Sequence, residues 1–129
     1  MGQPIATTQG VCAAFPDVLQ TPSPSGTVPV PYPNIAQLSA AGGTATTVTA
    51  GGRAVITEDS SIDSSSGGEA GTGGGPGGEH LGQCTFGTFS KTVTAEGGGV
   101  VRQGDRTSQN DGNATGTVTV GLPTVLVGG

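Results

Sequence analysis

The stretch TATTVTAGGRAVIT, residues 44–57, decides the fold class of this chain. It holds two runs rich in β-branched residues, and Gly51 and Gly52 lie between them. β-Branched side chains pack well on a pleated strand, and a Gly-Gly pair tolerates the positive φ angles of a tight two-residue turn. The stretch therefore predicts an antiparallel hairpin.

Two further segments follow the same plan. Residues 84–103, CTFGTFSKTVTAEGGGVVRQ, predict a second hairpin with a triple-glycine connection, and residues 115–129, TGTVTVGLPTVLVGG, predict two short strands around Gly121-Leu122-Pro123. Together these segments predict roughly six strands, in which Thr and Val alternate and one face is polar. Only residues 34–40, NIAQLSA, begin with a cap-like residue followed by residues that tolerate a helix, and this stretch is too short to be stable alone. We expect an all-β fold, rich in glycine and proline, with almost no helix.

The composition allows one small domain with a thin core. The chain has 129 residues, of which 26 are Gly and 9 are Pro, and 32% are hydrophobic. Such a share of Gly and Pro is also typical of low-complexity, partly disordered chains. Disordered chains usually carry more charge than the 10% found here, and the apolar residues are spaced as in strands. We therefore favour an ordered fold of turns and short strands.

The charge balance excludes two classes of partner. The net charge is −5, and the chain has only four Lys or Arg residues. Four cations neutralise few phosphates, so we expect neither nucleic-acid binding nor attachment to an anionic membrane surface. The N-terminus, MGQPIATTQG, has no basic region followed by an apolar one, and so we expect synthesis in the cytoplasm without a signal peptide.

Glycine is concentrated in residues 60–80, SSIDSSSGGEAGTGGGPGGEH. Glycines permit either a flexible loop or a close approach of two backbones, and the composition leaves both open. Residues 73–78 contain a bare GxGxxG pattern. A dinucleotide site needs a strand before this pattern and a helix after it, whereas here Pro76 interrupts the pattern and no helix is predicted to follow. We therefore expect no nucleotide site.

Three residues are candidate metal ligands: Cys12, His80 and Cys84. A zinc site takes four ligands, or three when water completes the shell, so Asp17 or Asp105 would have to add a carboxylate to a complete set. The alternatives are two buried thiols, or a disulfide formed after export, since thiols stay reduced in the cytoplasm. The spacing leaves zinc, free thiols and a disulfide open.

No arrangement of residues points to catalysis. A nucleophilic site needs a Ser or Cys beside a base that a third group orients, and His80 with Cys84 does not form a recognisable pair of this kind. The acidic residues of the glycine-rich region are best interpreted as a solvated polar edge; they are Glu58, Asp59, Asp63 and Glu69. We expect this chain not to be an enzyme.

Three long segments resemble one family. Residues 13–37 contain Phe-Pro-Asp-Val, then Thr-Pro, then Pro-Val-Pro-Tyr-Pro-Asn-Ile-Ala; residues 47–75 contain the hairpin followed by Ser-Ser-Gly-Gly-Glu-Ala-Gly-Thr; residues 84–111 contain a closing strand pair. Together they resemble the PAAR-like spike-tip family of contractile injection systems, which include type VI secretion systems, extracellular injection particles and phage tails. The resemblance covers residues 13–113. It implies an N-terminal extension over 1–12, the spike-tip domain over 13–113, and C-terminal strands over 114–129 without a fused effector domain.

The resemblance implies a small conical fold of short hairpins and a structural function. The broad base would sit on the three-stranded end of a trimeric, VgrG-like spike protein, with one tip on each trimer, and the tip would sharpen the spike and aid membrane puncture. One chain on a three-fold partner needs three pseudo-equivalent faces. The injection machine would carry the chain out of the cell, and any effector cargo would bind non-covalently. The alternatives are an adaptor that recruits a separate effector, and a small hydrolase that uses His80 and Cys84.

The resemblance also assigns residues that shape the tip or contact the spike: Pro29, Pro31, Tyr32, Pro33, Asn34, Ile35, Glu69 and Gly71. Proline restricts φ, so the alternating prolines would keep residues 28–33 extended without the need for hydrogen bonds to a partner strand. Tyr32 would be the main apolar anchor beneath the tip, with its hydroxyl bonded to a polar partner.

Related tips often bind zinc near the apex through His and Cys residues. At the matching positions this chain has Val101, Gln103 and Gln109. Glutamine is a poor zinc ligand, so either the three candidate ligands named above form a relocated site, or the tip contains no metal and is held by hydrogen bonds. We favour the second interpretation.

Overall fold

The computed structural model describes residues 2–73 and 80–129, and these residues form an almost entirely β structure. One turn of 3-10 helix, Leu38–Ala40, is the helical element of this part of the chain. The strands, all of which pair antiparallel, are β1 (Gln3–Ile5), β2 (Val11–Ser23), β3 (Gly26–Gln37), β4 (Ala41–Gly42), β5 (Ala45–Ala50), β6 (Arg53–Val55), β7 (Ser61–Ile62), β8 (Cys84–Phe86), β9 (Thr94–Ala95), β10 (Gly98–Gly99), β11 (Arg106–Gln109), β12 (Ala114–Val118) and β13 (Leu122–Val127).

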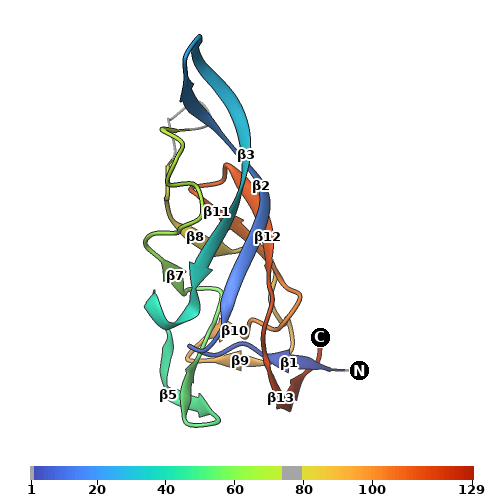
Figure 1. Ribbon diagram of the computed structural model, residues 1–129. Coiled ribbons are helices and arrows are strands. Elements are labelled where there is room, and N and C mark those ends of the chain that lie inside the picture. Colours follow the sequence, from blue (N-terminus) through green and yellow to red (C-terminus); the bar gives the residue numbers. More distant parts are fainter. Residues whose placement is uncertain (1, 74–79) are drawn as a thin grey trace.

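The strands are divided between one large sheet and three small ones. Seven strands form a sheet in the order β3-β2-β12-β11-β8-β7-β4, and the other described strands form the two-stranded sheets β1–β13, β5–β6 and β9–β10. In Figure 1 the molecule tapers from a broad end, which holds β1, β5, β9 and β13, to a narrow end at the turn between β2 and β3. We call the broad end the base and the narrow end the point. The predicted all-β class is confirmed.

The point is a long hairpin of β2 and β3. Their register runs from Val11 opposite Gln37 to Ser23 opposite Gly26, with one bulge between Ala14 and Asp17. Residues 28–33 are extended, as predicted, and they also pair with β2, a partner strand that the proline pattern by itself does not require.

The prolines fit this hairpin because β3 is an edge strand. The backbone N–H of Ile35 points to the outer edge, where it donates to the carbonyl oxygen of Ser66 at 2.8 Å. Pro33, Pro31 and Pro29 alternate with Ile35 along the strand, so the nitrogen atoms that cannot donate face the same outer edge. Proline at these positions leaves the pairing with β2 intact and prevents another strand from joining the outer edge.

Of the helix-tolerant residues 34–40, Leu38–Ala40 form one 3-10 turn and the residues before them belong to β3, which continues to Gln37. Two local predictions differ from the structure. The turn of the β9–β10 hairpin is Glu96-Gly97, while Gly98 and Gly99 lie in β10, so the triple glycine is not the connection. The described residues form thirteen strands instead of about six, since many of them are only two or three residues long. The hairpin at Gly51-Gly52 is confirmed.

The segment 66–73 crosses the face of the point, and we call it the strap. It pairs with the outer edge of β3 at Ser66 and with the free edge of β2, where Gly73 lies opposite Gln20. Between these edges it covers Leu19, which is fully buried. A Cβ atom added at Gly71 would lie 2.6 Å from the Cβ of Leu19, and one added at Gly68 would lie 2.5 Å from its Cδ1. In the strap the glycines therefore serve close backbone approach.

The apolar residues form two clusters. The first combines residues of the large sheet with residues outside it, and it consists of Ala6, Cys12, Ala36, Leu38, Ile56, Ile62, Cys84, Phe86, Val101 and Val118. The second lies among the three small sheets and consists of Ile5, Ala45, Ala50, Val55, Ala95, Val100 and Val127. The second cluster belongs to the base.

Candidate functional site

Three backbone amides at the centre of the base form a closed ring of hydrogen bonds. The N–H of Ala6 donates to the carbonyl oxygen of Val101 at 2.9 Å, that of Val101 donates to Ile56 at 3.0 Å, and that of Ile56 donates to Ala6 at 3.1 Å. All three side chains are fully buried. Each residue thus makes the same two bonds as the other two, which is the relationship that a three-fold arrangement requires.

The residues around this ring repeat the arrangement. Ile5, Val55 and Val100 precede the ring residues, and Thr7, Thr57 and Arg102 follow them. Each of the first three is bridged to one of the second three: Ile5 to Arg102, Val55 to Thr7, and Val100 to Thr57. A second set of bonds follows the same order: Thr8 N–H to Ala54, Glu58 N–H to Gly99, and Gln103 N–H to Pro4. The base therefore has pseudo-threefold symmetry.

Each of the three small sheets belongs to one repeat. The strands that lead into the ring are β1, β6 and β10, and their partners are β13, β5 and β9. Gln3, Arg53 and Gly98 hold equivalent positions, and they pair with Val127, Ala50 and Ala95. These three partners are all buried in the second apolar cluster. The same core position is thus filled once by each sheet.

The amino-acid sequence carries a weak signal of this repeat, from which the repeat was not predicted. Residues 2–7, 52–57 and 97–102 each begin with glycine and place two apolar residues three and four positions later. The repeats share little else, and the intervals between them differ. Hydrogen bonding defines the equivalence more clearly than residue identity, because backbone bonds do not depend on side-chain type.

One of the three sheets is built differently from the others. β5–β6 and β9–β10 are hairpins closed by two-residue turns, and we call them the closed units. β1 and β13 come from opposite ends of the chain, and we call their sheet the open unit. In Figure 1 both chain ends lie beside this sheet.

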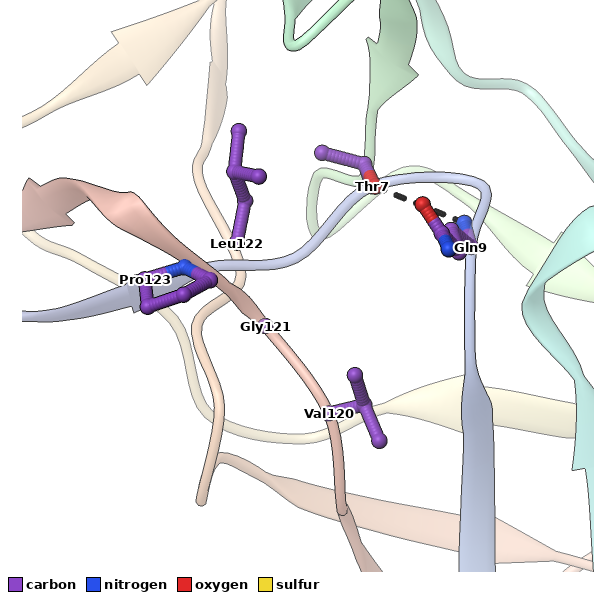
Figure 2. Close-up of a pocket in the computed structure, with 6 residues that line it drawn as sticks. All are labelled: Thr7, Gln9, Val120, Gly121, Leu122 and Pro123. Atoms are coloured by element: carbon purple, nitrogen blue, oxygen red, sulfur yellow. Dashed lines mark hydrogen bonds between the residues drawn. The ribbon is translucent and has the colours of Figure 1, made fainter.

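Two grooves open at equivalent positions of the base. The first has a volume of about 240 Å³, and Figure 2 shows Thr7 and Gln9 on one side of it and residues 120–123 on the other. The second has a volume of about 260 Å³ and is lined by Thr57 and Asp59, together with Gly43, Thr44, Ala45, Ala95 and Glu96. Thr7 corresponds to Thr57, and Gln9 corresponds to Asp59. The first groove is mainly apolar, while the second contains two carboxylates.

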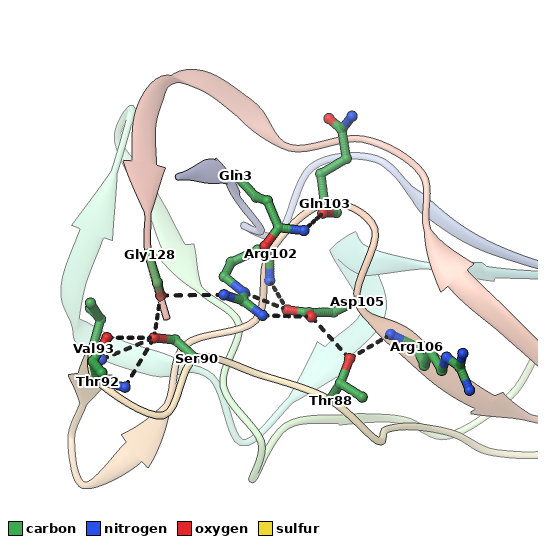
Figure 3. Close-up of polar contacts among 10 residues, drawn as sticks. All are labelled: Gln3, Thr88, Ser90, Thr92, Val93, Arg102, Gln103, Asp105, Arg106 and Gly128. Atoms are coloured by element: carbon green, nitrogen blue, oxygen red, sulfur yellow. Dashed lines mark hydrogen bonds and ion pairs between the residues drawn. The ribbon is translucent and has the colours of Figure 1, made fainter. Parts of the chain in front are cut away.

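At the third equivalent position the residue is Arg102, and its side chain forms a polar cluster (Figure 3). Its Nε donates to Asp105 at 2.9 Å, and its Nη2 donates to the other carboxylate oxygen at 2.9 Å. The hydrogen bond to Asp105 raises the pKa of Arg102. Burial raises the pKa of Asp105, but the hydrogen bonds from Arg102 and Thr88 outweigh this effect, so the pKa lies below its usual value. Asp105 is thus part of a buried ion pair and is not available to complete a metal site.

A buried cluster of amides surrounds Asp17 where the β2–β3 hairpin meets the residues that follow β11. The Nδ2 of Asn113 donates to this carboxylate at 2.6 Å, that of Asn110 at 3.1 Å, and that of Asn34 at 3.3 Å. Asn34 also donates to Ser65 at 2.8 Å. Asp17 and Asn34 come from the Phe-Pro-Asp-Val and Tyr-Pro-Asn-Ile motifs, so these motifs meet in a hydrogen-bonded junction.

The remaining residues assigned to the tip lie along the point and the strap. Tyr32 is half-buried, and its hydroxyl lies 2.8 Å from the Oγ1 of Thr21. Ile35 is half-buried and bonds to the strap through its backbone, and the carboxylate of Glu69 accepts the N–H of Gly67 at 3.0 Å. Gly71 is buried against β2. None of these contacts reaches the base, so in the described residues these positions support the point.

The three candidate metal ligands do not gather at one place. Cys12 and Cys84 are free thiols in the first apolar cluster, and the Nε2 of His80 lies 2.8 Å from the carbonyl oxygen of Gly68 in the strap. A hydrogen bond with Cys84, together with burial, raises the pKa of Cys12. Within residues 2–73 and 80–129, no three His, Cys, Asp or Glu side chains are placed to hold a metal ion. The GxGxxG pattern of residues 73–78 lies almost entirely outside the described residues.

Comparison with known protein families agrees with this architecture. The model of the toxin PAAR-like domain matches residues 10–116, which is most of the chain, and so the chain belongs to this family. The resemblance seen in the sequence is confirmed. No curated protein and no solved structure matches the chain.

Family membership places the chain among the spike-associated proteins of secretion systems, whose PAAR-like domains are structural or toxin-associated components. In the part of the chain that the structure describes, no helix is long and apolar enough to cross a membrane.

Proposed function

We propose that this chain is a structural spike tip that caps a trimeric spike protein, with one copy on each trimer. The base would rest on the spike, and the point would face away from it. The ring formed by Ala6, Ile56 and Val101 carries the proposal. A trimer presents three identical surfaces, and one chain can match all three only if it has three similar faces of its own.

The exposed apolar residues of the base support this orientation. Val48 and Val93 lie at equivalent positions of the two closed units, and each is 39% exposed. In the open unit Leu126 is 62% exposed, and Val120 nearby is 46% exposed. Exposed apolar side chains that recur around one end of a small protein are typical of an interaction surface.

The construction of the point supports the same orientation. Prolines block the outer edge of β3, and the strap occupies the free edge of β2 beside Gln20. A strand of the spike could not extend the sheet at these edges. A narrow end whose described strand edges are blocked in this way suits the leading end of a spike that punctures a membrane, and contraction of the machine would then carry the chain out of the cell.

Native mass spectrometry of the chain mixed with a trimeric spike protein of the same secretion system tests the proposal. We expect a dominant complex of three spike chains and one tip. The double variant Val48→Asp with Val93→Asp should abolish it, because charges would be buried against the spike. Val28→Asp on the point is the matched control, because Val28 is also 39% exposed. Loss of the complex with Val28→Asp but not with the base variant would overturn the orientation, and no complex with any form would overturn the proposal.

A second candidate function is that of an adaptor for a separate effector. The point carries Phe15, which is 66% exposed, and Val18, which is 42% exposed. An effector that binds there would be recruited to the spike without a covalent link. In this case Val18→Asp should prevent capture of the effector and leave the complex with the spike intact.

A further inference from the structure

The open unit lacks a connection that both closed units have. The turns of the closed units are Gly51-Gly52, with φ angles of 59° and 79°, and Glu96-Gly97, with φ angles of 51° and 84°. Two successive residues with positive φ are the signature of the tight turn that matches the twist of a hairpin. In the open unit, Gly128 follows β13 at the position of Gly51 and Glu96, and no turn joins it to β1.

Two side chains hold the carbonyl group of Gly128. The hydroxyl of Ser90 donates to it at 2.6 Å, and the Nη1 of Arg102 donates at 3.2 Å. Arg102 is itself fixed by two bonds to Asp105 (Figure 3). The two donors therefore fix Gly128, which corresponds to the first turn residue of each closed unit.

We propose that Ser90 and Arg102 form a polar clasp that replaces the missing turn and holds β13 on the base. The inference concerns the fold of the base and does not depend on spike binding. Among the described small sheets, β1–β13 is the pair whose strands no turn joins directly, whereas the strands of the closed units stay joined by a turn when their pairing opens. While these two side chains are bonded to Gly128, β13 stays paired with β1 and covers the second apolar cluster.

The residues at the equivalent positions show why arginine is needed here. Thr57 and Ser60 hold the positions of Arg102 and Asp105 in another repeat, where Thr57 is bridged to Val100 beside a closed unit, as Arg102 is bridged to Ile5 of the open unit. The N–H of Thr57 donates to the Oγ of Ser60 at 3.0 Å, just as the N–H of Arg102 donates to Asp105 at 2.7 Å. Thr57 and Ser60, which are both small, are thus sufficient to form the local turn. The longer side chain of Arg102 also reaches the carbonyl oxygen of Gly128. The closed units need no such contact, because a turn already joins their two strands.

Burial explains what the clasp protects. Val127 is 4% exposed and packs with Ile5 and Val100 in the second cluster, whereas Leu126 beside it is largely exposed. A short strand that is not joined to its partner by a turn frays more easily than a hairpin. After each local opening the unjoined strand loses more conformational entropy when it pairs again. Without the bonds to Gly128, β13 would therefore separate from β1 before the strands of the closed units separate, and this separation would expose Ile5.

The test is the double variant Arg102→Thr with Asp105→Ser, which copies Thr57 and Ser60 into the open unit. Replacing both residues avoids leaving the buried Asp105 without its partner. Amide hydrogen exchange is measured by mass spectrometry for β13 and β1, and for β5–β6 as an internal reference. We expect exchange in β13 and β1 to become about tenfold faster or more, with β5–β6 unchanged, because a hydrogen bond to a charged donor is lost.

A cyclised chain provides the matched control. Joining Gly128 directly to Gly2, without Gly129 and Met1, creates the sequence Val127-Gly128-Gly2-Gln3, which corresponds to Ala50-Gly51-Gly52-Arg53 of a closed unit. In the cyclised chain the double variant should have little effect on β13, because a covalent turn now holds the strand. Three results would each overturn the proposal. Hydrogen exchange could become faster by the same factor in all three small sheets, could stay unchanged in β13 of the linear chain, or could become equally faster in β13 of the cyclised chain.

Discussion

The side-chain amide of Gln109 donates to the Oδ1 and to the backbone oxygen of Asn34, each at 2.9 Å. Gln109 also accepts the hydroxyl of Thr107 at 2.6 Å and is fully buried. The family resemblance of the sequence implies a histidine at this position, and the contacts of Gln109 join β11 to β3. Hydrogen bonds therefore connect the point to β11 at this position.

The first prediction concerns this contact. Gln109→Glu would remove the donors to Asn34 and place a buried carboxylate beside two oxygen atoms, so we expect the free energy of unfolding to fall by about 3 kcal/mol or more. Urea unfolding measures the change. Gln103→Glu is the control, because Gln103 is exposed and should tolerate the charge. Equal effects of the two substitutions would show that the network around Asn34 contributes no special stability.

The strap provides the second prediction. Gly71→Ala should destabilise the protein, by about 1–3 kcal/mol, because the new Cβ would lie 2.6 Å from the Cβ of Leu19 and the strap would have to shift. Gly42→Ala is the control, since a Cβ at that position meets nothing within 4 Å. Thermal unfolding compares the two variants. If Gly71→Ala were as stable as the parent, the strap would not lie as close to β2 as the structure shows.

The ring of the base leads to the third prediction. Ile56 is fully buried, and its equivalent in another repeat is Ala6. Ile56→Ala would leave a cavity in the first apolar cluster, so we expect a loss of about 2–5 kcal/mol in the free energy of unfolding. Val48→Ala on the surface of the base should cost much less. Chemical denaturation of both variants decides the comparison, and a similar loss for the two would contradict the assignment of Ile56 to the core.

The fourth prediction is a dependence of stability on pH. The pKa of Asp105 is lower in the folded protein than its ordinary value of 3.8, so the unfolded chain binds the proton more tightly. The contribution of Asp105 is therefore present above that value and is lost as the pH falls below it toward the folded pKa, while Arg102 remains charged. Unfolding free energies measured from about pH 6 to pH 2 should fall less steeply for Asp105→Asn than for the parent. Identical slopes would mean that Asp105 does not titrate with unfolding.

The fifth prediction concerns the two thiols. Cys12 and Cys84 are both fully buried, and the pKa of Cys12 is raised by its hydrogen bond with Cys84 and by burial. The thiolate is the reactive form, so we expect neither cysteine to react with a thiol reagent in the folded protein, and both to react in denaturant. Titration with a chromogenic disulfide reagent counts the reactive thiols. Rapid reaction of one thiol under native conditions would show that the first apolar cluster opens readily.

Several features of this protein follow from local sequence. The β-branched run around Gly51-Gly52 predicted a hairpin, and the structure has it, because the positive φ angles of such a turn are a local property of glycine. The proline-rich residues 28–33 were predicted to be extended for a similar reason. Their partner strand was missed, since β2 contains Pro16 and Pro22 and has little alternation that would mark it as a strand.

The site was less visible in the sequence. The motif residues Asp17 and Asn34 were recognised as parts of a pattern, but their meeting with Asn113 depends on the folded sheet. The threefold ring was missed because its three members share only apolar character, and because the bonds join backbone atoms of residues far apart in the chain.

The β class, the tight glycine turns and the extended conformation of the proline-rich segment follow from the sequence, since they depend on φ preferences and side-chain shape within a few neighbouring residues. Family membership follows from the sequence too, because it rests on residue patterns. The folding of the whole chain is what closes one ring from three separate segments, pairs β13 with β1, and brings Arg102 to the carbonyl oxygen of Gly128. These relationships join residues from distant parts of the chain, and they arise because buried backbone groups must find partners wherever the fold brings them together.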